Sequence, residues 1–152
     1  MSLGRLFRDR YRLWRRRFRL FMLRTFDWYK RRYARRRIAE ITPRNTRLTV
    51  DVEEDLFLLG MPIVPTLTAT LEDRAAPEVA KLAVIHVLGA LGEPPCLEVL
   101  DRMAREAGGA IGRKAEKDLR LACRRLARKG QLPARYREYV DAVPAEPSSE
   151  MN

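Results

Sequence analysis

The chain has 152 residues, with 31 Lys+Arg against 20 Asp+Glu and a formal net charge of +11. This length suits one domain, or one small domain with an appendage, and 46% hydrophobic residues exclude a disordered composition overall. Two cysteines without a CxxC pair or a histidine cluster exclude a disulfide scaffold and a zinc knuckle. These counts favour a reducing, intracellular compartment.

The positive charge is concentrated at the N-terminus. Residues 1–40 hold 15 basic and three acidic residues, a net of +12, whereas residues 41–152 have a net of −1. The second part divides again, with −8 over residues 48–101 and +9 over residues 102–137. Charge blocks of this kind govern association and solubility and do not specify a fold.

Residues 1–41 are predicted to form the first unit, one long, basic, amphipathic helix. Apolar side chains recur there at alternating spacings of three and four residues, which is the period of one helix face. Arginines cluster on the opposite face. The aromatic stripe is the candidate membrane or partner-binding site, and its residues are Phe7, Tyr11, Trp14, Phe18, Phe21, Trp28 and Tyr29.

Several interpretations of this helix are open. The stripe can pack on the rest of the protein or on a partner helix, with the arginines in solvent. It can lie in a membrane interface, because Trp, Tyr and Phe prefer the headgroup boundary and a cationic face is attracted to anionic lipid. It can also bind nucleic acid, since arginines neutralise phosphates and aromatic rings stack on unpaired bases. A targeting peptide is a further alternative.

Residues 42–143 are predicted to form a domain of stacked helices, followed by a disordered tail over residues 144–152. Thr42 precedes a proline, which ends the first segment because that position is pushed out of the helical region. A helix is expected to start near Asp51, although the alternation of apolar residues over 48–52 also allows a brief strand. Further helices are expected at 78–91, from about 94 to 103, from about 111 to 129, and around 136–140.

The same domain repeats itself weakly with a period of 32 residues. Gly60 and Pro62 fall opposite Gly92 and Pro94, so each unit is predicted as a helix, a Leu-Gly-x-Pro turn and a second helix. Glycine there supplies a left-handed helix cap, and proline opens the next helix with its φ angle preset.

These two turns, and the helix rich in small residues over 78–91, resemble HEAT-like (armadillo-type) helical repeats. The resemblance covers about residues 50–130, just over half of the chain. It implies an all-α fold, a short solenoid of helical hairpins, and a scaffold or adaptor that binds proteins on a concave face. Some relatives in that family bind DNA or modify bilin-carrying proteins.

No grouping of residues in the sequence is typical of an active site. His86 is the only histidine and has no Ser, Cys or Asp three or four positions away. The acidic run 51–55 lacks the glycine-containing loop of calcium sites, and the glycines at 108–112 lack the spacing of a phosphate loop. Cys96 and Cys123 are expected to be small core residues. We therefore predict a non-enzyme with no catalytic residue, cofactor, metal or small-molecule substrate.

Two basic clusters support an alternative function, the binding of nucleic acid or another anion. Each of them can equally be a solvated helix face. The first cluster is Arg31, Arg32, Arg35, Arg36 and Arg37, and the second is the stripe Lys117, Arg120, Arg124 and Arg128. The main prediction is a HEAT-like scaffold with a protein partner, located in the cytoplasm, for which peripheral attachment to an anionic membrane surface is an open possibility.

Overall fold

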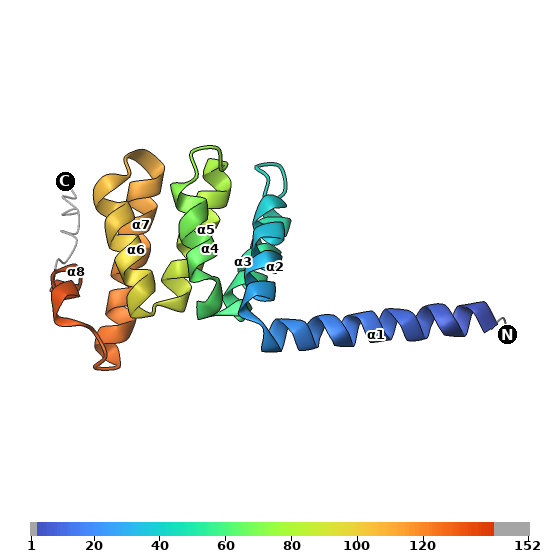
Figure 1. The fold of residues 1–152 in the computed structure, drawn as a ribbon. Helices are drawn as coiled ribbons and strands as arrows, with labels where there is room; N and C mark the ends of the chain where they lie inside the picture. The colour runs from blue at the N-terminus through green and yellow to red at the C-terminus, as the bar shows by residue number, and fades with distance from the viewer. Residues whose placement is uncertain (1–2, 142–152) are drawn as a thin grey trace, which may run out of the picture.

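The computed structural model describes the backbone of residues 3–141 and the side chains of residues 14–141. Over this part the chain is helical and contains no strand, so the predicted all-α class is confirmed (Figure 1). The side chains of Phe7 and Tyr11, and the tail predicted to be disordered over residues 144–152, lie outside the described residues.

The N-terminal segment consists of two helices where the sequence predicts one. Helix α1 spans Leu3–Thr25 and α2 spans Asp27–Ala39, and Phe26 between them is extended, with φ −121° and ψ 116°. No proline or glycine marks this break. It turns α2 onto the other helices, where Ala34 and Ile38 are buried, while α1 projects away from them (Figure 1).

The remaining elements follow the Gly and Pro positions closely. Gly60 and Gly92 follow the ends of two helices with φ of 70° and 62°. The predicted left-handed cap is confirmed at Gly92, where ψ is 16°, and is wrong at Gly60, where ψ is −155°. Pro94 opens the next helix as predicted, whereas Pro62 lies in a short 3-10 turn before the next helix. The first helix of this region begins earlier than expected, because the Asn45 side chain accepts a hydrogen bond from the Leu48 N–H at 3.0 Å and caps it. The brief strand allowed over 48–52 is wrong. The elements are α3 Thr46–Leu59, η1 Met61–Ile63, α4 Val64–Glu72, α5 Glu78–Leu91, α6 Pro94–Glu106, α7 Gly109–Arg128, η2 Ala134–Tyr136 and α8 Glu138–Asp141.

Helices α2 with α3, α4 with α5, and α6 with α7 stand side by side as three pairs (Figure 1). The sequence predicts different pairs, α3 with α4 and α5 with α6, joined by the Gly-Pro turns. In the structure those turns lead from one pair to the next, and α7 makes the most extensive packing contacts, with α5 and α6. The difference arises because a turn signal marks where the chain reverses and does not say which neighbour a helix packs on.

A single aliphatic core runs through these pairs. It includes Ala34, Ile38 and Ile41, so the end of the first predicted unit shares this core with the body. Whether residues 1–41 behave as a separate unit stays a prediction. At the centre α5 and α7 approach closely, and glycine at position 89 permits this. A Cβ on Gly89 would lie 2.9 Å from the Asp118 Cβ. The largest fully buried side chains are Leu56, Ile63, Leu67, Ile85, Leu88, Leu97, Leu100, Leu119, Val52, Val84, Val87 and Cys96.

Candidate functional site

A row of exposed aromatic rings runs along α1 and across the break into α2. The Trp14 and Phe18 rings stack with their centroids 5.4 Å apart, and the Phe26 ring lies 6.5 Å from Phe21 and 6.4 Å from Trp28. We call this row the aromatic face, and its members are Trp14, Phe18, Phe21, Phe26 and Trp28.

The aromatic face is solvent-exposed. The side chains of Trp14, Phe21 and Trp28 are 59%, 57% and 56% exposed. Fully burying one such side chain is worth about 1.5–3 kcal/mol, so the aromatic face is a candidate interaction site. The predicted residue Tyr29 stands beside the face, with its ring 5.7 Å from Trp28, and is only partly exposed.

Phe26 belongs to this face although the periodicity of the sequence does not place it there. The spacing of three and four residues places position 25 on the stripe, between Phe21 and Trp28. In one uninterrupted helix, position 26 would lie about 100° around the helix axis from position 25. The extended conformation of Phe26 removes that constraint and brings its ring between those of Phe21 and Trp28. No turn residue in the sequence signals this break.

The corner between α1 and α2 contains a strongly basic hollow of about 430 Å³. The Arg19 guanidinium lies over the Tyr33 ring, 5.1 Å from its centroid, which fixes one wall. We call this the arginine hollow, and its lining is Arg15, Arg19, Tyr29, Arg32, Tyr33, Arg36, Arg37 and Glu40.

Asp55 of α3 anchors the far side of the hollow. Its carboxylate accepts hydrogen bonds from Arg37 Nε at 2.8 Å and from the Tyr33 hydroxyl at 3.2 Å, and Arg37 also pairs with Glu40. Burial raises the pKa of Tyr33, and the neighbouring Asp55 carboxylate raises it further. Burial alone would lower the pKa of Arg37, but Glu40 and Asp55 outweigh it and raise that pKa. Arg37 therefore stays charged and ties α2 to α3.

The predicted cluster of five arginines in α2 is thus divided by the structure. Arg31 points to the body and donates from Nε to the Pro62 carbonyl oxygen at 2.9 Å, and Arg37 is held by carboxylates. Arg32 and Arg36 line the hollow, while Arg35 is exposed outside it. Arg15 and Arg19 of α1 lie beside this cluster because of the angle between α1 and α2. The sequence does not show that angle and therefore does not single them out.

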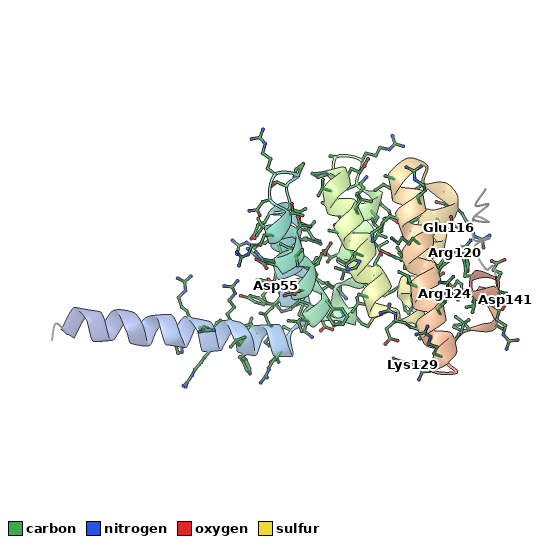
Figure 2. The ribbon with its side chains drawn as sticks, turned by 180° about the vertical axis from the view of Figure 1, so that it is seen from behind. Asp55, Glu116, Arg120, Arg124, Lys129 and Asp141 are labelled. Atoms are coloured by element: carbon green, nitrogen blue, oxygen red, sulfur yellow. The ribbon has the colours of Figure 1, made fainter. Side chains whose placement is uncertain are left out.

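The predicted basic stripe of α7 lies at the opposite end of the row of helices. Glu116 is one turn away and accepts a hydrogen bond from Arg120 at 2.7 Å (Figure 2). A shallow depression of about 410 Å³ lies along this face, and Lys117 and Arg124 line it. Arg128 is exposed in the last turn of the helix.

A further hollow of about 920 Å³ lies between α4, α6 and η2. Its rim carries charges of both signs that pair with one another. Arg102 lies 2.7 Å from Glu72, and Arg135 lies 3.8 Å from Glu98. Because these charges are matched within the chain, the rim favours neither an anion nor a cation.

His86 has acidic neighbours that come from other helices. Asp118 of α7 is 5% exposed, pairs with Lys114 Nζ at 2.9 Å, and lies 3.9 Å from His86 Nδ1. Burial raises the pKa of Glu53 on α3 nearby. Cys96 and Cys123 are buried in the core as expected, and burial raises both thiol pKa values to about 11, so the thiols stay protonated at neutral pH. The assignment as a non-enzyme stays a prediction.

In the part of the chain that the structure describes, no cluster of His, Cys, Asp and Glu is arranged to hold a metal ion. No helix there has both the length and the apolar character to cross a membrane. The chain matches no protein-family model, no curated protein and no solved structure. The resemblance to HEAT-like repeats therefore stays a prediction.

Proposed function

We propose that this protein is a non-enzymatic adaptor, built as a short HEAT-like stack of helices, that attaches to an anionic membrane surface and leaves its body accessible to a protein partner. The observation that carries the proposal is the exposed aromatic face on α1, a helix that projects away from the body. Aromatic rings at such a position suit the boundary between headgroups and acyl chains.

The charges around the aromatic face support this proposal. Arg17 and Arg24 are exposed and lie one helical turn from Phe21, so they would meet lipid phosphates while the rings enter the interface. Each cation near an anionic membrane contributes on the order of 1 kcal/mol. Docking through α1 and the start of α2 would leave the row from α3 to α7 in water.

Nucleic-acid binding is the second candidate, and two observations make it the weaker one. Arg31 and Arg37 are engaged by the protein itself, which removes two members of the N-terminal cluster. The α7 stripe lies at the other end of the row of helices, so the two basic regions do not form one track (Figure 1). A strand would have to cross the acidic block between them.

The test is co-sedimentation of the full chain with vesicles of phosphatidylcholine alone and of phosphatidylcholine mixed with phosphatidylserine. The variant Trp14→Ala/Phe21→Ala/Trp28→Ala removes three rings and leaves every charge in place. We expect binding to the anionic vesicles to fall by about tenfold or more. Binding at the wild-type level in this variant, or no binding of the wild type, would overturn the proposal.

A matched control removes exposed apolar side chains elsewhere. Val50, Phe57 and Leu58 of α3 are 48%, 47% and 80% exposed, and their triple alanine variant should bind vesicles within about twofold of the wild type. Duplex DNA at two salt concentrations provides the comparison with the second candidate. Nucleic-acid binding predicts that log affinity falls with log salt by about 0.9 for each phosphate contact.

A further inference from the structure

The arginine hollow brings several cationic side chains together in one corner of the fold. Five arginines line it against the single carboxylate of Glu40. That carboxylate is already paired with Arg37, which also bonds to Asp55. Gathering like charges in one corner costs Coulomb energy, so a buried or bound anion would stabilise the arrangement.

Two of these arginines are available to an anion. Within the described part of the chain, Arg32 and Arg36 make no ion pair, and they stand on the same face of α2, four residues apart. Arg19 is held in place by its stacking on Tyr33. The corner therefore offers two unengaged guanidinium groups beside a third whose position is fixed, and ordering these groups in advance reduces the entropy cost of binding.

We propose that the arginine hollow binds a phosphate monoester, the group that phosphorylated lipid headgroups carry. A phosphate monoester has a charge of about −1.5 to −2 at neutral pH and three acceptor oxygens. Guanidinium forks bond to such oxygens in pairs. A hollow of about 430 Å³ has the size of sites that hold small organic molecules, about 300–1,000 Å³, which suits a headgroup better than a bare ion.

This inference rests on the proposed attachment to membranes and names the lipid that the site would select. The hollow and the aromatic face lie on the same two helices, since Tyr29 lines the hollow and its ring contacts Trp28 of the face. When the rings enter the interface, the hollow lies beside them at the level of the headgroups. The rings then supply general affinity, and the hollow supplies preference for one phosphate chemistry.

The test measures binding of the full chain to two kinds of phosphatidylcholine vesicle with the same total charge. One kind carries a phosphoinositide bisphosphate, and the other carries phosphatidylserine. We expect the wild type to prefer the first, and Arg32→Gln/Arg36→Gln to lose that preference by about tenfold. The control Arg16→Gln/Arg35→Gln removes the same charge from exposed positions outside the hollow and should keep the preference.

Three results would overturn the site: a wild type that binds both kinds of vesicle equally well, an equal loss in both arginine pairs, or a preference that survives Arg32→Gln/Arg36→Gln. Soluble inositol bisphosphate separates a lipid headgroup from a free phosphate as the source. Tighter binding to the vesicle than to the soluble compound supports a lipid headgroup as the source of the phosphate. Equal binding to the two overturns that source. If the wild type ignores all vesicles but binds the soluble compound through Arg32 and Arg36, the site stands and the membrane function fails.

Discussion

Helices α1 and α7 have the same kind of amphipathic pattern and opposite environments. The inward residues of α7, such as Ala115, Leu119 and Cys123, are 0% exposed, whereas the Trp14 and Phe21 rings of α1 are more than half exposed. The difference follows from side-chain size. Small residues such as Ala115 and Cys123 let α7 lie close against α5 and α6, while the bulky rings of α1 stay exposed.

The charged faces of α1 and α7 also differ, in how many of their cations have a carboxylate on the same helix. On α7, Lys114 pairs with Asp118 and Arg120 pairs with Glu116, each one turn apart. The described side chains of α1 include five arginines and no carboxylate. Helix α7 therefore balances part of its charge internally, whereas the described side chains of α1 supply no carboxylate for such pairs. A helix that packs on its neighbours and a helix whose rings are exposed can therefore share one periodicity and still differ in these two respects.

The largest expected effect is the difference in the free energy of unfolding between a core truncation in α7 and a matched truncation in α1. Leu119→Ala removes a fully buried side chain and should lower the free energy of unfolding by about 2–5 kcal/mol. Phe21→Ala removes a larger ring from an exposed position and should change it by less than about 0.5 kcal/mol. Urea unfolding of both variants measures the difference. Equal losses would mean that the aromatic face is packed in solution.

A smaller effect is expected where α6 turns into α7. A Cβ on Gly112 would collide with the Ala107 carbonyl oxygen, so Gly112→Ala should destabilise the fold by about 1–3 kcal/mol. Gly108→Ala is the control, because its added methyl meets nothing within 4 Å and its φ of −81° suits any residue. The urea midpoint of this control should stay close to that of the wild type. A similar loss in both variants would contradict the close approach.

The smallest effect concerns the contact that holds α8 to α6. The Tyr139 hydroxyl donates a hydrogen bond to the Asp101 carboxylate. Burial would raise the pKa of Asp101, but the hydrogen bonds from Tyr139 and Arg105 outweigh it and lower that pKa. Burial and the bond to Asp101 raise the pKa of Tyr139 to about 12. Tyr139→Phe should cost about 1 kcal/mol at neutral pH, a modest value because the pair is partly exposed.

The pH dependence of this cost provides the check. Because the pKa of Asp101 is lowered on folding, its contribution is present above its ordinary pKa, about 3.9, and is lost as the pH falls through the folded value. Because the pKa of Tyr139 is raised on folding, its contribution is present below about 10 and is lost as the pH rises toward about 12. The difference in thermal midpoint between wild type and Tyr139→Phe should therefore shrink at both extremes. A constant difference across this range would exclude the contact.

Much of the local structure was predictable from single residues. Proline and glycine have narrow backbone preferences, so α5 begins after Pro77 and ends before Gly92 as expected. The break at Phe26 was not predictable, since that residue has no special preference and the bend is decided by the burial of Ala34 and Ile38 against the body. The same bend creates the arginine hollow, so the spacing of residues along the chain does not show that Arg15 and Arg19 belong to it.

The sequence by itself determined the helical class, the helix ends at Gly92 and Pro94, and the segregation of aromatic and basic residues near the N-terminus. These depend on local backbone preference and on spacing along one helix. Only the tertiary structure decided which stripes are covered, how the helices pair, and which arginines share a corner. Such choices depend on distances between residues far apart in the chain, such as the ion pair of Arg37 with Asp55, which periodicity does not encode.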